Sequence, residues 1–64
     1  MTVNGEARTY RPGLRLLGLL DELKVDARAV AVMVGEEVYR PGRIPDVALA
    51  EGDVIEVVSM MQGG

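Results

Sequence analysis

Only one stretch of this chain has the spacing of an amphipathic helix, and that single helix limits the folds open to the sequence. Apolar residues recur there at i, i+1, i+4 and i+7, which is one stripe along a helix. They are Leu16, Leu17, Leu20 and Leu23. We expect the helix to follow the Pro12-Gly13 break and to end near 24–26. Gly18 inside it is interpreted as the mark of a close backbone approach, because glycine costs a helix about 1 kcal/mol relative to alanine.

The residues before this helix predict a hairpin, and those after it predict a buried strand. Residues 1–4 and 7–11 flank Asn4-Gly5, a strong hairpin signal because both residues tolerate positive φ. Residues 28–34 are a run of Ala, Val and Met with no charge after the first residue. Such a run predicts a buried central strand.

The end of the chain predicts the rest of one sheet. We expect a short return strand over 37–40, one helical turn over 46–50 and a β-branched closing strand over 54–59. One helix must then cover one face of a mixed sheet of about five strands. This order predicts an α+β β-grasp, the ubiquitin-like fold, with a domain over 1–59 and a flexible C-terminal tail over 60–64.

The inventory of side chains excludes most catalytic chemistry. The 64 residues include no Cys and no His, which removes thiol and imidazole catalysis, disulfides and the usual zinc ligands. No segment approaches the ~20 apolar residues of a membrane span, and the first residues do not read as a signal peptide. We therefore expect a cytoplasmic protein that is not an enzyme, binds no metal and has no membrane partner.

The charge balance bears on the kind of partner. The formal net charge of −3 argues against nucleic acid, whose phosphates need clustered Lys and Arg. The same balance fits a partner with a basic docking surface. Arg40 and Arg43 stand on either side of Pro41-Gly42, where they are interpreted as solvated loop residues rather than as contacts to an acidic partner.

The chemical group that remains is the main-chain carboxylate of Gly64. Gly63-Gly64 follow the expected closing strand after only a few residues. Glycine has no Cβ, so it gives a slim approach to another protein's site. Residues 59–64 reach roughly 20 Å when extended at ~3.3 Å per residue. That is enough to enter a buried nucleotide site while the body docks outside, with Gly64 reacting and Gly63 giving access.

Alternation along the closing strand predicts a docking surface beside this tail. Val54, Glu56, Val58 and Met60 share one side of the strand, and Met61 follows in the tail. Glu56 is expected to face water. The apolar members are then partly exposed, and we interpret them, together with Met61, as residues that contact a partner.

Four blocks of the sequence carry a family resemblance. They are Val3-Asn4-Gly5-Glu6, Leu19-Leu20-Asp21-Glu22-Leu23, Val30-Ala31-Val32, and the stretch from Leu49-Ala50-Glu51-Gly52-Asp53 through Val54-Ile55-Glu56-Val57-Val58 toward Gly63-Gly64. With them, the whole chain resembles the ThiS sulfur carriers of the MoaD/ThiS family of ubiquitin-like proteins. Gly35-Glu36 and Met61-Gln62 depart from the family pattern.

The resemblance implies a carrier mechanism for thiamin thiazole biosynthesis. An E1-like adenylating enzyme of the ThiF type would use ATP and Mg²⁺ to convert the Gly64 carboxylate into an acyl-adenylate. Sulfur that originates from a cysteine desulfurase would displace AMP and leave a thiocarboxylate. A thiazole synthase of the ThiG type would then receive the sulfur. ATP belongs to the partner's site, so the resemblance implies no cofactor bound by this chain.

Three alternatives stay open. A MoaD-like subunit of molybdopterin synthase or a tRNA-thiolation carrier would use the same chemistry at Gly64 and differ in the recipient. A ubiquitin-like protein modifier would instead join Gly64 to a target lysine through an isopeptide bond. A pure interaction domain would keep its function without Gly63-Gly64.

Overall fold

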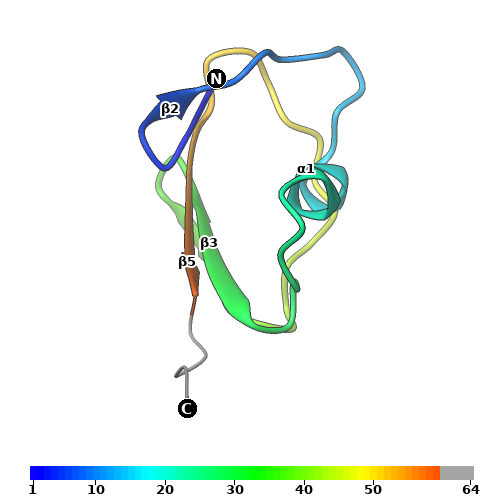
Figure 1. Cartoon of the computed structure of the whole chain (residues 1–64), viewed down its shortest axis with the longest axis vertical. Helices are drawn as coiled ribbons and strands as arrows, with labels where there is room; N and C mark the ends of the chain where they lie inside the picture. The colour runs from blue at the N-terminus through cyan, green and yellow to red at the C-terminus, as the bar shows by residue number, and fades with distance from the viewer. Residues whose placement is uncertain (60–64) are drawn as a thin grey trace.

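The computed structural model describes residues 1–59, which form a five-stranded mixed sheet with a helix packed against one face (Figure 1). The expected β-grasp is confirmed. In chain order the elements are β1 (Thr2–Val3), β2 (Glu6–Ala7), α1 (Leu16–Glu22), β3 (Val30–Val34), β4 (Glu37–Tyr39) and β5 (Val54–Ser59).

The last of these strands lies in the middle of the sheet, whose order is β2-β1-β5-β3-β4. On one side β1 runs parallel to β5, with Thr2 opposite Val54. On the other side β3 runs antiparallel, with Val30 opposite Ser59. The end of β5 that leads into residues 60–64 therefore lies beside the start of β3.

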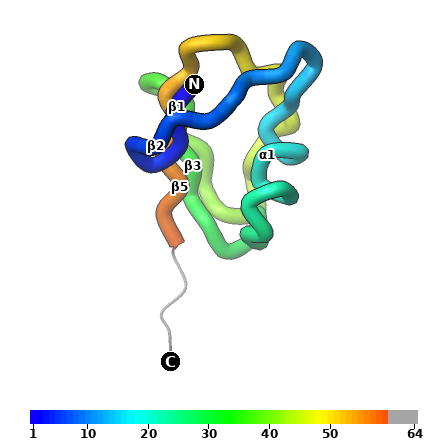
Figure 2. Tube along the Cα trace, turned by 45° about the horizontal axis from the view of Figure 1, so that its top comes forward, coloured from blue at the N-terminus to red at the C-terminus, as the bar shows by residue number. Residues whose placement is uncertain are grey.

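The core is aliphatic, as the composition predicts, and it lies between the sheet and α1, which Figure 2 shows set apart from the strands. Its buried side chains come from the helix, from three strands and from two loops. They are Val3, Leu14, Leu16, Leu19, Leu20, Val30, Val32, Leu49 and Ile55. The interpretation of Gly18 is wrong, because a Cβ at this position would meet nothing within 4 Å.

The helix ends earlier than expected, at Glu22. The backbone N–H of Val25 donates to the carbonyl of Leu20 at 3.2 Å, and that of Lys24 to Asp21 at 3.0 Å. These two bonds define a Schellman motif, which needs a left-handed residue after the helix. Lys24 takes that conformation with φ of 60°, so the chain turns away before residues 24–26 can extend the helix.

The start of the helix depends on a distant residue. The side chain of Arg15, at the N-cap, makes no capping bond. A carboxylate oxygen of Asp46 instead accepts the backbone N–H of Leu17 at 3.1 Å, and the guanidinium of Arg15 donates to Asp46 at 3.2 Å. The helical turn expected over 46–50 is wrong, because that segment pairs with the residues that begin α1, including a bridge between Ala48 and Arg15.

The hairpin turn at Asn4-Gly5 is confirmed, since both residues have positive φ, 52° and 82°. Its strands are shorter than the expected 1–4 and 7–11, because after Ala7 the chain leaves the sheet to reach the helix.

The prediction that residues 28–34 form a buried central strand is only partly right. β3 is interior to the sheet, but only one of its faces is covered. Val32 is fully buried while the neighbouring Met33 is 37% exposed. A single helix covers a single face of the sheet, so the uncharged run 30–34 is not buried on both sides.

Candidate functional site

The sheet face that α1 does not cover carries exposed apolar residues. Val54 and Val58 are 54% and 48% exposed, so the alternation along β5 places them correctly. Glu56 lies between them and is partly buried rather than fully in water. Their role in docking remains a prediction, and Met60 and Met61 lie outside the described residues.

The structure adds two residues that sequence reasoning missed. Met33 of β3 lies opposite Val38 of β4 and, on its other side, opposite Glu56 of β5. Val38 is 63% exposed. We call Met33, Val38, Val54 and Val58 the apolar face. The alternation within β3 could have identified Met33 as an outward-facing residue. Only the strand register shows that residues from three strands form one surface.

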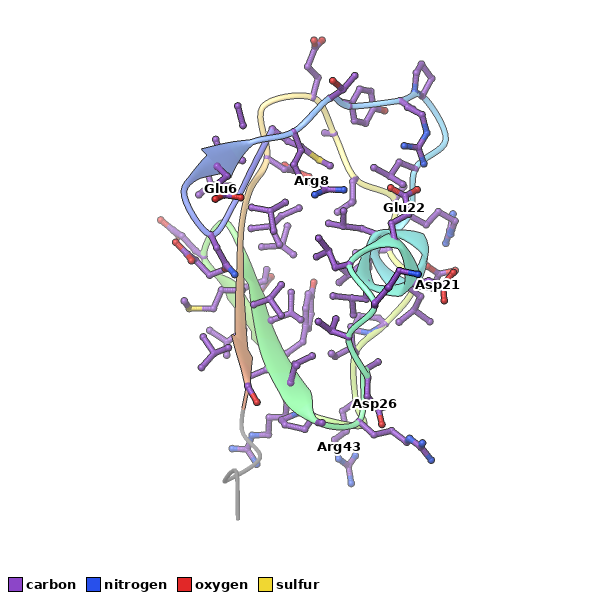
Figure 3. The ribbon with its side chains drawn as sticks, viewed as in Figure 1. Glu6, Arg8, Asp21, Glu22, Asp26 and Arg43 are labelled. Carbon is purple, nitrogen blue, oxygen red and sulfur yellow. The ribbon has the colours of Figure 1, made fainter. Side chains whose placement is uncertain are left out.

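The predicted reactive residues, Gly63 and Gly64, lie outside the described part of the chain. The structure fixes their point of attachment at Ser59, the last residue of β5, opposite Val30. Arg43 lies at the same end of the molecule (Figure 3). Val54 and Val58 of the apolar face therefore lie on the same strand as Ser59.

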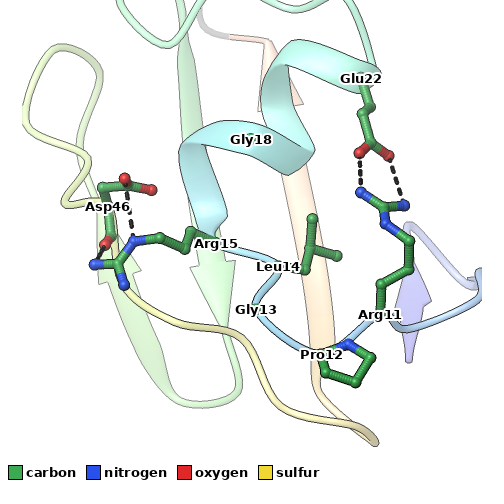
Figure 4. A pocket seen from close by; sticks show the side chains of 8 residues that line it. All are labelled: Arg11, Pro12, Gly13, Leu14, Arg15, Gly18, Glu22 and Asp46. Atoms are coloured by element: carbon green, nitrogen blue, oxygen red, sulfur yellow. Dashed lines mark hydrogen bonds and ion pairs between the residues drawn. The ribbon is translucent and has the colours of Figure 1, made fainter.

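A hollow of about 350 Å³ lies elsewhere, beside the start of α1 (Figure 4). It is lined by Arg11, Pro12, Gly13, Leu14, Arg15, Gly18, Glu22 and Asp46. Arg11 donates to the carboxylate of Glu22, and Arg15 pairs with Asp46. Each arginine is matched by an acid, which gives these residues a structural role in holding the loop to the helix.

Two carboxylates have shifted pKa values. The hydrogen bond from Arg11 lowers the pKa of Glu22 below its ordinary value, and the charges of Arg11 and Arg8 act in the same direction. The backbone N–H of Arg28, helped by its guanidinium, lowers the pKa of Asp26. Both shifts favour the charged form of exposed ion pairs.

Within residues 1–59 no three acidic side chains come together as a metal site would need. The same residues contain no helix with the length and apolar character to cross a membrane; α1 has seven residues.

Comparison with known proteins identifies the family. The model of the ThiS family matches residues 1–64. The chain belongs to the ThiS family.

Two relatives show how far the similarity extends. The sulfur carrier protein ThiS of Thermus thermophilus is 44% identical over 62 residues, which cover 97% of this chain and 95% of that protein. A thiazole synthase of Paramagnetospirillum magneticum is 36% identical over 64 residues. These residues cover this whole chain but only 20% of that protein, so a ThiS-like segment is one part of a much longer chain.

Proposed function

We propose that this chain is a sulfur carrier in thiamin thiazole biosynthesis and that the Gly64 carboxylate bears the sulfur. The observation that supports this most is the 44% identity to a protein named as a sulfur carrier, over nearly the full length of both chains. The absence of Cys and His from the sequence agrees with it, because the chemistry then rests on a main-chain group and on partner enzymes.

The proposed chemistry begins with activation, because a free carboxylate is a poor electrophile. A carboxylate oxygen of Gly64 attacks the α-phosphorus of ATP in the site of an E1-like adenylating enzyme of the ThiF type, and pyrophosphate leaves. A persulfide sulfur, supplied through a cysteine desulfurase, attacks the acyl carbon and AMP leaves. Cleavage of the sulfur–sulfur bond by a thiol then gives the thiocarboxylate. ATP and Mg²⁺ belong to the partner, so this chain acts as a carrier and not as a catalyst.

The proposed recipient is a thiazole synthase of the ThiG type. Support comes from the Paramagnetospirillum magneticum protein of that name, which contains a segment similar to this whole chain. Joining a carrier to its acceptor in one polypeptide raises their effective concentration. A thiocarboxylate sulfur is nucleophilic, so it can be handed to an electrophilic carbon held in the acceptor's site.

The body of the protein contributes docking. The apolar face and the start of the tail both belong to β5 or its neighbours, so a partner that covers this face also receives the tail. Gly63 then gives the slim passage that the reaction needs.

Intact mass spectrometry tests the proposal. The chain is incubated with ATP, Mg²⁺, a ThiF-type enzyme, a cysteine desulfurase and cysteine. We expect a mass gain equal to the replacement of one oxygen by sulfur, located at Gly64 by fragmentation. A chain lacking Gly64 is the matched control and should gain no mass. An unchanged wild-type mass, with an adenylating enzyme that modifies its own carrier, would contradict the proposal.

The recipient is tested separately with the isolated thiocarboxylate. We expect loss of the sulfur when a ThiG-type synthase and its substrates are added. Transfer to a molybdopterin precursor or to tRNA instead would identify another sulfur-carrier pathway. Conjugates from Gly64 to lysines would identify a protein modifier.

A further inference from the structure

Two arginines are held side by side by a rigid turn over residues 40–43. The backbone N–H of Arg43 donates to the carbonyl of Arg40 at 2.9 Å, and Gly42 has φ of 76°. Proline and glycine in the second and third positions are the signature of a type II turn, in which the first and last Cα atoms lie within about 7 Å. Pro41 fixes its own φ, so the backbone that carries the Arg40 and Arg43 side chains is held in one conformation.

This turn lies at the end of the molecule from which the tail departs. Tyr39, just before it, pairs with Val32 of β3, and the N–H of Gly42 donates to the carbonyl of Ala27 at 3.0 Å. Ser59 is reached across β3, and neighbouring strands lie about 4.8 Å apart. Tyr39 is therefore roughly 10 Å, two strand spacings, from Val57, which lies two residues before Ser59. Figure 3 shows Arg43 at this end.

These arginines differ from the others in the sequence. Four arginines have a carboxylate within ion-pair distance: Arg8, Arg11, Arg15 and Arg28. Within residues 1–59, Arg40 and Arg43 have no carboxylate partner, and both are exposed. A charge pair held in place without an internal partner is available to an external one.

The opposite end of the sheet carries the reverse charge. Glu36 and Glu37 lie in and after the turn between β3 and β4, while Glu51 and Asp53 precede β5. The net charge of −3 therefore describes the chain as a whole but not the end that bears the tail.

We propose that Arg40 and Arg43 dock onto carboxylates of the adenylating enzyme, at the rim of the opening that admits the tail. This rests on the proposed function, in which the tail must enter that enzyme's site. The guanidinium fork matches a carboxylate in two parallel hydrogen bonds. An acidic rim attracts this end of the carrier and repels the acidic end, so it orients the encounter. The net charge of the whole chain favoured a partner with a basic surface, whereas this contact requires an acidic one.

The test compares two double variants with the same change in net charge. Arg40→Gln with Arg43→Gln removes the two charges from the turn. Thr9→Glu with Ala50→Glu adds two negative charges at exposed positions away from the tail end. Carrier-dependent pyrophosphate release by the ThiF-type enzyme gives KM and kcat. At low ionic strength we expect the arginine variant to raise KM for the carrier roughly tenfold with kcat unchanged, and the control to change it little. The difference should shrink in high salt.

Each other outcome overturns the proposal. An unchanged KM with the wild-type salt dependence would show that the arginines make no contact. A lower kcat would place them in the chemistry rather than in docking, and an effect confined to sulfur transfer would assign them to the acceptor. Equal thermal unfolding of the variants and wild type controls for folding. Failure of wild-type adenylation would instead contradict the proposed function.

Discussion

The side-chain oxygen of Asn4 accepts a hydrogen bond from the backbone N–H of Val57 at 2.7 Å. One step earlier, the backbone N–H of Asn4 donates to the carbonyl of Ile55 at 2.8 Å. The asparagine side chain thus continues the pairing between β1 and β5 past the end of β1. It supplies an acceptor to the part of β5 that leads into the tail, at a residue that also has φ of 52° to form the hairpin turn.

Asn4→Gly separates these two roles, because glycine keeps the left-handed conformation and loses only the side-chain bond. We expect the free energy of unfolding to fall by about 1 kcal/mol and the amide of Val57 to exchange its hydrogen faster. Asn4→Ala should cost a further ~1 kcal/mol, since alanine is disfavoured at this φ. Urea unfolding and hydrogen exchange measure both. Unchanged protection at Val57 in Asn4→Gly would show that the bond does not form in solution.

Gly18→Ala should stabilise the protein by about 0.5–1 kcal/mol, because glycine is a poor helix former and an added Cβ meets open space. Gly52→Ala is the matched control. Its Cβ also meets nothing within 4 Å, but Gly52 has φ of 92°, so the same substitution should destabilise. Urea unfolding of the two variants should give opposite signs. A loss of stability in Gly18→Ala would instead indicate that another part of the chain approaches Gly18 closely, contrary to the structure.

The sequence predicted the fold where local patterns decide it. The Asn4-Gly5 turn and the β-branched run 54–59 each depend on near neighbours, and both are confirmed. The leucine spacing correctly predicted a helix, but the stripe was wrong at one position: Leu19 is fully buried, while Leu17 is 38% exposed. Element boundaries set by distant residues could not be predicted. The hydrogen bond from the backbone N–H of Leu17 to the side chain of Asp46, which caps the helix, joins residues far apart in sequence. No local pattern predicts it.

The pair between Arg11 and Glu22 predicts a pH dependence of stability. The pKa of Glu22 is lower in the folded state than its ordinary value of 4.5. The contribution of the pair is therefore complete above that value and is lost as the pH falls through the folded-state pKa. We expect Glu22→Gln to lose stability less steeply than wild type below about pH 5. Glu36→Gln, which alters an exposed turn residue, serves as the control and should follow the wild-type curve.

Val58→Asp should fold and yet fail to be adenylated, because it places a charge in the centre of a contact that must exclude water. Val58 is 48% exposed, so little core packing is lost. Leu17→Asp is the matched control, since Leu17 is 38% exposed on the helix, away from the apolar face. Pyrophosphate release measures activation, and thermal unfolding verifies the fold. Normal adenylation of Val58→Asp would remove the apolar face from the docking surface.

The candidate site was only partly visible in the sequence. Alternation along one strand identified Val54 and Val58, since that pattern needs no knowledge of other strands. Met33 and Val38 join them only through the sheet register. The arginine turn was dismissed as solvated loop, because its position beside the base of the tail follows from topology and not from spacing along the chain.

The pairing of the first strand with the last sets an order on biosynthesis. Thr2 of β1 pairs with Val54 of β5. About fifty further residues must therefore leave the ribosome before β1 can pair with the strand in the centre of the sheet. At about 5–20 residues per second this takes roughly 3–10 s. During that interval the leucines of the helix have no complete sheet to cover them. The apolar face, to which Val54 and Val58 belong, therefore cannot form in a nascent chain before β5 is made.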